Sequence, residues 1–175
     1  MSEDLIQPGE IAYRLDMTAA ELKIVHTALK ALFDDLGQKT FVVDQFPPKA
    51  NLVKLSGNFL VASVIECLGE AVALIRKAGV DPTQFLGILT GSLFAAPVYE
   101  TYGELILEDR FRPAGFTMPL GLKDMRGVLA AADAKNVPMP IASLLRDHFI
   151  TGIARGKADL DWSALARLTA ENAGL

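Results

Sequence analysis

From the double proline at 47–48 onward, apolar residues recur with the period of an α-helix. Residues 49–78 contain no proline and are apolar on nearly every face, which predicts one long helix at the centre of a bundle or at an interface. Gly79 is placed to end this helix, and Asp81-Pro82 has the pattern that begins the next one. Further helices are expected at about 96–108, 119–135, 139–155 and 161–172.

The first 45 residues have a mixed pattern. Residues 10–16 alternate weakly between apolar and polar, and residues 40–43 are β-branched and aromatic, so each segment predicts a short strand. Between them, Thr18 and Glu21 have the spacing of a capping box, and the apolar periodicity that follows predicts a helix over 19–36.

The predicted fold is therefore mainly α, a helical bundle built on one long central helix and preceded by a short strand–helix–strand segment. Two strands and one helix do not form a stable sheet layer by themselves, and their edges are open to pairing. Residues 1–46 thus resemble the end of a domain, and residues 47–175 predict an all-helical domain. Two features favour a homodimer or a larger assembly: the predicted strands lack neighbours, and the long helix is apolar on nearly every face.

Composition places the chain among cytoplasmic globular proteins. The chain has 175 residues, 51% of them hydrophobic, which excludes intrinsic disorder. A net charge of −4 argues against a nucleic-acid partner, and the single cysteine suits a reducing compartment. The acidic N-terminus lacks the pattern of a signal peptide. Two uncharged stretches, 55–65 and 82–99, are too short or too interrupted by polar residues, Gly and Pro to predict a membrane span.

The charges are unevenly distributed along the chain. Residues 110–157 carry 8 basic and 3 acidic side chains, whereas residues 1–109 carry 8 basic and 15 acidic ones. The basic segment either faces an anionic small ligand or consists of solvated helix faces, and the pattern alone leaves both interpretations open.

Most familiar catalytic motifs are absent from the sequence. No G-x-G-x-x-G, G-x-x-x-x-G-K, H-E-x-x-H or G-x-S-x-G pattern occurs, and no Cys/His cluster could hold zinc, so no metal is expected. His26 and His148 stand alone on predicted helices and are expected to have packing roles. Cys67 lies in the most apolar helix and is expected to be a small core residue.

Polar residues inside the long apolar helix are the remaining candidates for chemistry. Lys54 and Asn58 are four residues apart and therefore project from one face, and Glu66 and Glu70 repeat this spacing. A lysine buried in such a helix would need a partner, and burial would adjust its proton affinity toward a role in proton transfer. The spacing alone favours the other interpretation, in which the lysine reaches solvent and the asparagine caps a neighbouring loop.

Several ordered motifs resemble the β-hydroxyacid dehydrogenases, which include 3-hydroxyisobutyrate dehydrogenase, tartronate semialdehyde reductase and the glyoxylate/succinic semialdehyde reductases. The resemblance covers about residues 38–165. Its motifs are Ala50-Asn-Leu-Val-Lys54-Leu-Ser-Gly-Asn58-Phe, Glu66-Cys-Leu-Gly-Glu70-Ala, Lys77-Ala-Gly-Val-Asp81-Pro, Phe111-Arg-Pro-Ala-Gly-Phe116, Leu122-Lys123-Asp124, Val137-Pro-Met-Pro140 and Asp159-Leu-Asp161-Trp-Ser-Ala-Leu165.

This resemblance implies the helical C-terminal domain found in 6-phosphogluconate dehydrogenase-like enzymes, with a substrate and dimerisation role. It implies that Lys54 is the catalytic general acid/base, that Asn58 orients the substrate oxygen or carboxylate, and that Lys123 reaches an NAD or NADP cofactor. The implied reaction interconverts a small β-hydroxy acid and its aldehyde or keto acid.

Two departures from the family pattern concern the substrate: Gly57 stands where many members have Asn, and Ala130 where many have an acidic residue. A larger departure is that the glycine-rich nucleotide-binding domain is missing, and residues 1–46 resemble only its end. This chain alone is therefore expected to bind the cofactor weakly or not at all. The alternative function is a non-catalytic helical dimerisation or binding module.

Overall fold

The computed structural model describes residues 18–36, 40–44 and 47–175. The chain forms two units, residues 1–43 and 44–175, which are described separately. In the first unit, helix α1 (Ala19–Leu36) confirms the predicted helix. The backbone N–H of Thr18 donates to Glu21 Oε2 at 2.8 Å, and the backbone N–H of Glu21 donates to Thr18 Oγ1 at 3.3 Å, so the predicted capping box is confirmed as well.

The predicted strand at 40–43 is wrong, because residues 40–44 have no regular secondary structure. A β-branched run suits a pleated surface, but a strand forms only beside a hydrogen-bonded neighbour. Within the described residues, β-type pairing is limited to one bridge, between Thr117 and Asp161 in the second unit. The strand predicted at 10–16 lies outside the described residues, and the origin of residues 1–46 in a nucleotide-binding domain stays a prediction.

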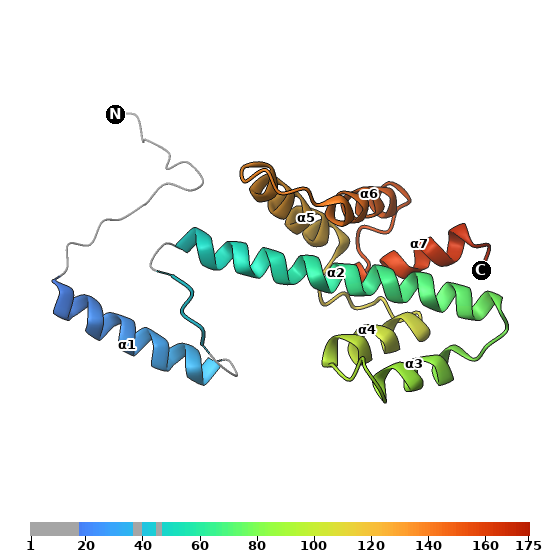
Figure 1. Cartoon of the computed structure of the whole chain (residues 1–175), viewed down its shortest axis with the longest axis horizontal. Helices are drawn as coiled ribbons and strands as arrows, with labels where there is room; N and C mark the ends of the chain where they lie inside the picture. The colour runs from blue at the N-terminus through green and yellow to red at the C-terminus, as the bar shows by residue number, and fades with distance from the viewer. Residues whose placement is uncertain (1–17, 37–39, 45–46) are drawn as a thin grey trace. The chain divides into compact units, whose positions relative to one another are not determined.

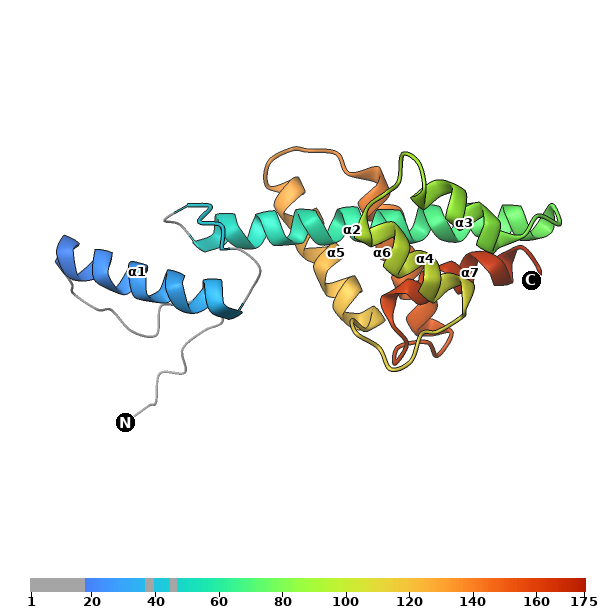
Figure 2. The same ribbon diagram turned by 90° about the horizontal axis from the view of Figure 1, so that it is seen from below.

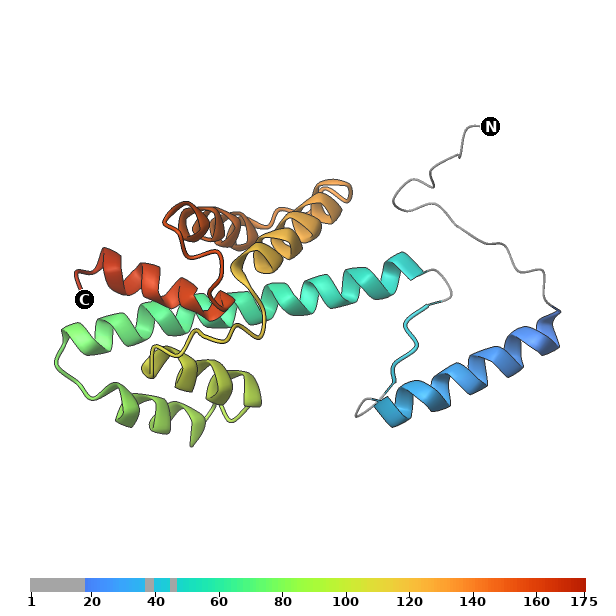
Figure 3. The ribbon, with the colours of Figure 1, turned by 180° about the vertical axis from the view of Figure 1, so that it is seen from behind.

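The second unit is built on helix α2 (Pro47–Lys77), which has 31 residues and confirms the predicted long central helix. All five later α-helices of this unit contact α2. In Figures 1 and 3, α3 and α4 lie on one side of α2, and α5, α6 and α7 lie on the other. The bounds of these helices are α3 (Pro82–Thr90), α4 (Pro97–Leu107), α5 (Met118–Asp133), α6 (Pro140–Ala154), the short 3-10 helix η1 (Trp162–Ala164) and α7 (Leu165–Asn172).

Helix α2 is also long and apolar enough to cross a membrane, since Pro48–Lys77 contains a window of mean hydropathy 1.8. The packing of the other helices along it accounts for much of this apolar character, because their contacts bury Ala62, Ile65, Leu68 and Val72. The central position thus explains the buried part of the helix, which is 39% of this window.

The ends of the helices follow from local sequence. Gly79 adopts a left-handed φ of 73°, which lets the backbone N–H of Val80 donate to Ile75 O at 3.1 Å and closes the end of α2. Asp81 then caps α3, because its side chain accepts a hydrogen bond from the backbone N–H of Thr83 at 2.9 Å. These are the end points expected from the sequence.

The hydrophobic core lies along α2 where α5, α6 and the C-terminal segment pack against it. Phe149, Met118 and Leu165 are among its fully buried side chains. Helices α2 and α7 pack closely at Gly69, where an added Cβ would lie 2.7 Å from the backbone Cα of Ala166. This arrangement places one end of α5 beside the first turns of α2.

Candidate active site

Lys54 and Asn58 of α2 converge on one carboxylate of α5. Lys54 Nζ donates to Asp124 Oδ2 at 2.6 Å, and Asn58 Nδ2 donates to the same oxygen at 2.6 Å. Figure 2 shows α5 crossing α2, and this crossing brings together residues about seventy positions apart in sequence. The predicted shared face of Lys54 and Asn58 is therefore confirmed, and the face is directed at Asp124.

Asp124 is fully buried, and its charge is stabilised only by neighbouring groups. Burial by itself raises the pKa of this carboxyl. The hydrogen bonds from Lys54 and Asn58, together with the charges of Lys54 and Lys123, outweigh burial and hold the pKa below its ordinary value. Among the described residues, Oδ1 has no hydrogen-bond partner, and Lys123 Nζ lies 3.5 Å from it. Asp124 is thus an ionised carboxylate that anchors two donors.

Lys54 reaches solvent, as the spacing favoured, because 49% of its side chain is exposed. The N-terminal turns of α2 are covered by α5 on one face and open on the other, so the ammonium group is paired on one side and accessible on the other. Lys54 Nζ also lies 5.9 Å from the centre of the Phe116 ring. The ammonium is therefore held in a fixed place while it stays reachable by a ligand.

Phe116 is positioned by a buried aspartate. The backbone N–H groups of Gly115 and Phe116 both donate to Asp161 Oδ2 at 3.0 Å, and Ser163 donates to Oδ1 through its backbone N–H and its hydroxyl. The Phe116 ring packs on Trp162 with 4.7 Å between ring centres. Asp161 thus caps the C-terminal helical segment and also fixes the loop that carries the ring beside Lys54.

Lys123 precedes Asp124 on α5 and is largely exposed, with 68% of its side chain accessible. Its ammonium group faces the Asp124 carboxylate, which Lys54 also contacts. The structure therefore brings all three predicted site residues to one place. An exposed ammonium group at the rim of the site suits an anionic group of a cofactor.

Glu66 takes part in a separate buried pair further along α2. His148 Nδ1 of α6 lies 2.8 Å from Glu66 Oε1, and the Glu66 side chain is 6% exposed. Burial raises the pKa of Glu66 above its ordinary value, and the facing His148 opposes this effect only in part. The pair is a polar contact between α2 and α6, and the packing role of His148 stays a prediction.

Cys67 is exposed, so its predicted place in the core is wrong. It lies on the face of α2 opposite to the buried residues. Partial burial and the nearby Glu70 and Glu66 carboxylates raise the pKa of its thiol, which disfavours a reactive thiolate.

Two positioning residues were missed by sequence reasoning. Asp124 was noted only within a motif, although it falls on the buried stripe of its helix with Gly121, Val128 and Ala132, where a carboxylate needs a partner. Phe116 likewise had no assigned position near Lys54. A charged residue on an apolar stripe is the signal that could have identified Asp124. In the part of the chain that the structure describes, no three His, Cys, Asp or Glu residues could hold a metal ion together.

Comparison with known proteins identifies the family. Residues 49–169 match the family model described as NAD-binding of NADP-dependent 3-hydroxyisobutyrate dehydrogenase, and this match spans more than half of the chain. The chain belongs to the 3-hydroxyisobutyrate dehydrogenase family. The matched region contains Lys54, Asn58 and Asp124, so the cluster described above is part of the family domain.

Two of the similar proteins are named as an oxidoreductase and a reductase. The chain is 44% identical over 140 residues to an uncharacterized oxidoreductase, YfjR, of Bacillus subtilis, covering 80% of this chain and 49% of the relative. It is 30% identical over 165 residues to 2-hydroxy-3-oxopropionate reductase of Escherichia coli, covering 93% of this chain and 56% of the relative. The chain thus spans about half the length of these two relatives.

A solved structure supports the fold. The crystal structure of 3-hydroxyisobutyrate dehydrogenase from Salmonella typhimurium aligns with a TM-score of 0.61 and 22% identity, over 66% of this chain and 40% of that one. The predicted mainly α architecture, of the type found in the C-terminal domain of these enzymes, is confirmed.

Proposed function

We propose that this chain supplies the acid/base part of the active site of an NAD(P)-dependent oxidoreductase that interconverts a small β-hydroxy acid and its aldehyde or keto acid. The observation that carries the proposal is the convergence of Lys54 and Asn58 on the buried Asp124 carboxylate. Membership of the 3-hydroxyisobutyrate dehydrogenase family and the names of the relatives support the same class of reaction.

Lys54 serves as the proton donor in the reducing direction. An ammonium group has three N–H donors, and one of them is committed to Asp124 at 2.6 Å. The others remain for a substrate oxygen on the open side of the residue. In reduction, the carbonyl carbon gains a hydride while its oxygen takes a proton from Lys54, and the resulting amine recovers a proton from water. In oxidation, the amine removes the hydroxyl proton.

Asn58 and Phe116 define where the substrate lies. Asn58 donates one N–H to Asp124, which leaves its second N–H and its side-chain carbonyl oxygen to orient a hydroxyl or carboxylate group. The Phe116 ring, fixed by Asp161, supplies an apolar wall near the proton donor. Such positioning increases the rate because proton and hydride transfer require a defined geometry.

Lys123 is the residue of this chain proposed to contact the cofactor. Its exposed ammonium group fits an anionic group, in agreement with the basic character of residues 110–157. When bound, the nicotinamide ring supplies or accepts the hydride. The phosphate-binding glycine turn belongs to a segment that this sequence does not contain, so the chain alone is expected to bind the cofactor weakly or not at all.

The proposal is tested by fusing this chain to the part of the Bacillus subtilis relative that it does not cover. The fusion should form NADH or NADPH from a panel of small β-hydroxy acids, and the unfused chain should not. Asn58→Ala should raise KM more than it lowers kcat, because its role is to orient the substrate. The matched control is Asn51→Ala, an exposed asparagine of the same helix, which should change neither. A folded, cofactor-binding fusion that oxidises none of the acids would favour the helical-module function instead.

We further propose that two copies of the chain associate through α2. Val53, Leu60, Cys67 and Leu74 are spaced seven residues apart and form one stripe along the helix, defined here as the α2 stripe. Leu60 is 62% exposed and Leu74 is 70% exposed. Exposed apolar residues that recur along one face of a helix are suited to packing against a second helix of the same kind.

Sedimentation velocity tests this assembly. The chain should sediment as a dimer at micromolar concentration, and Leu60→Lys with Leu74→Lys should convert it to a monomer. Leu93→Lys is the control, because Leu93 is 94% exposed but lies in a turn away from the stripe. A compact monomer of the unmodified chain at these concentrations would contradict the proposal.

A further inference from the structure

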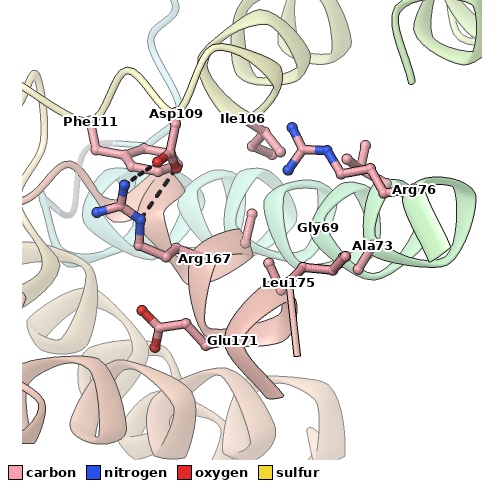
Figure 4. Close-up of a pocket in the computed structure, with 12 residues that line it drawn as sticks. Gly69, Ala73, Arg76, Ile106, Asp109, Phe111, Arg167, Glu171 and Leu175 are labelled. Atoms are coloured by element: carbon pink, nitrogen blue, oxygen red, sulfur yellow. Dashed lines mark hydrogen bonds and ion pairs between the residues drawn. The ribbon is translucent and has the colours of Figure 1, made fainter. Parts of the chain in front are cut away.

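A cavity of about 300 Å³ lies toward the C-terminal end of α2, where α7 and the segment that follows α4 close around it. It is more than four helical turns from Lys54, about 20 Å along the helix axis. Small and aliphatic residues form its walls: Gly69, Val72, Ala73, Ile106, Ala166 and Ala170. Figure 4 shows Arg76 on one side of this cavity and the ion pair of Arg167 with Asp109 on the other.

Most charges at the cavity are already compensated within the chain. Arg167 binds Asp109 with two hydrogen bonds, one of them at 3.2 Å between Nε and Oδ1, and its guanidinium lies 5.3 Å from the centre of the Phe111 ring. Glu171 is paired with Lys157 at 2.6 Å and with Arg155 at 3.5 Å. These groups therefore need no additional counter-ion.

Arg76 is different. It is half-buried, and its recorded hydrogen bond runs from Nη2 to the backbone oxygen of Leu107 at 3.2 Å. Within the described part of the chain, no carboxylate lies within ion-pair distance of this guanidinium. A guanidinium has five N–H donors in a planar fork, so most of them remain available on the side of the cavity. The cavity thus combines apolar walls with an arginine that has no ion pair within the described residues, and Leu175, the last residue of the chain, lines it as well.

We propose that this cavity binds a small monocarboxylate with a short aliphatic body. The carboxylate would form a bidentate pair with Arg76, which is the geometry that guanidinium and carboxylate groups prefer. The aliphatic part would lie against Val72, Ala73 and Ala170. A doubly charged phosphate is disfavoured, because the Asp109 and Glu171 carboxylates, which also line the cavity, would repel the second negative charge. The site is independent of Lys54 and of the proposed reaction.

The test is an NMR titration of the isotope-labelled chain with isobutyrate, an aliphatic monocarboxylate of the proposed class. Saturable shifts should occur for the Arg76 side chain and for the backbone amides of Val72, Ala73 and Ala170. Isobutyramide, which has the same shape without the charge, should bind at least about tenfold more weakly, because a charge-assisted pair is lost. Inorganic phosphate should not give the same saturable shifts.

Two variants locate the site. Arg76→Gln should weaken isobutyrate binding at least about tenfold, while Arg126→Gln, which removes an exposed arginine of α5, should leave it unchanged. Ala170→Leu should abolish binding by filling the cavity and should retain the far-ultraviolet spectrum of the folded chain. Absence of saturable shifts, equal binding of isobutyramide, or unchanged binding by both site variants would overturn the proposal.

Discussion

Replacing Asp124 by Asn should destabilise the second unit, because the carboxylate is the shared acceptor of Lys54 and Asn58. The amide has nearly the same shape but no charge. It keeps one oxygen acceptor, and its NH2 group would face donors. Asp124 has no exposed surface, so a water molecule cannot take over as the acceptor that the substitution removes.

The size of this effect follows from the two contacts. Each hydrogen bond to a charged group contributes about 1.5–3 kcal/mol, but the amide oxygen can still accept one of them. Lys54 is 49% exposed, so its charge remains solvated after the change, and the full cost of a stranded buried charge does not apply. We therefore expect a loss of about 2 kcal/mol, which corresponds to roughly 6–10 °C in Tm for a unit of this size.

Thermal unfolding followed by circular dichroism measures this loss at neutral pH. The matched control is Asp147→Asn, which removes an exposed aspartate paired with Arg146 and should leave Tm nearly unchanged. A cycle that adds Lys54→Met to both backgrounds should show that the effects of Lys54 and Asp124 are not additive.

The pH dependence gives an independent test of the same pair. The pKa of Asp124 is lowered in the folded chain, so its contribution to stability is present above its ordinary value of 3.8 and is lost as pH falls through the lowered value. The stability difference between the unmodified chain and Asp124→Asn should therefore shrink on acidification below pH 3.8. Equal Tm values for the two proteins at neutral pH would refute the reasoning.

Two further predictions concern α2. Burial raises the pKa of Glu66 despite the facing His148, so the stability due to this carboxyl is greatest below its ordinary pKa of 4.5 and declines as pH rises through the raised value. Glu66→Gln should gain stability relative to the unmodified chain from acidic to neutral pH, and parallel Tm profiles of the two proteins would contradict this. Gly57→Ala should stabilise the chain by about 0.5–1 kcal/mol because no atom lies near the added methyl group. Gly69→Ala should destabilise it by about 1–3 kcal/mol because the methyl group would meet Ala166. Denaturant unfolding measures both glycine substitutions, and changes of the same sign in the free energy of unfolding would contradict these predictions.

Helix positions were predictable from the sequence because local chemistry determines them. Thr18 with Glu21, and Asp81 with Pro82, begin helices through hydrogen bonds within a few residues, and Gly79 ends one by its left-handed backbone. The strand predicted at 40–43 failed for the opposite reason, since a strand depends on a neighbour that local sequence does not specify.

The candidate site was predictable only in part. The spacing of Lys54 and Asn58 placed them on one face, and family resemblance added Lys123. The partner of Lys54, however, is Asp124, 70 residues away, and this contact arises from the crossing of α2 and α5. The exposure of Lys54 likewise depends on which face α5 covers. Contacts between distant helices are set by tertiary packing, which the local pattern does not contain.

The central claim is that Lys54 transfers the proton, and kcat of the fusion described above tests it most directly. Lys54→Ala should lower kcat by about 10²–10⁴, the usual effect of losing a positioned general acid/base. Lys54→Arg should not restore the rate, because a guanidinium does not give up its proton near neutral pH. Lys49→Ala, which removes another exposed lysine of α2, should leave kcat unchanged. A Lys54→Ala fusion that retains the unmodified kcat would contradict the account.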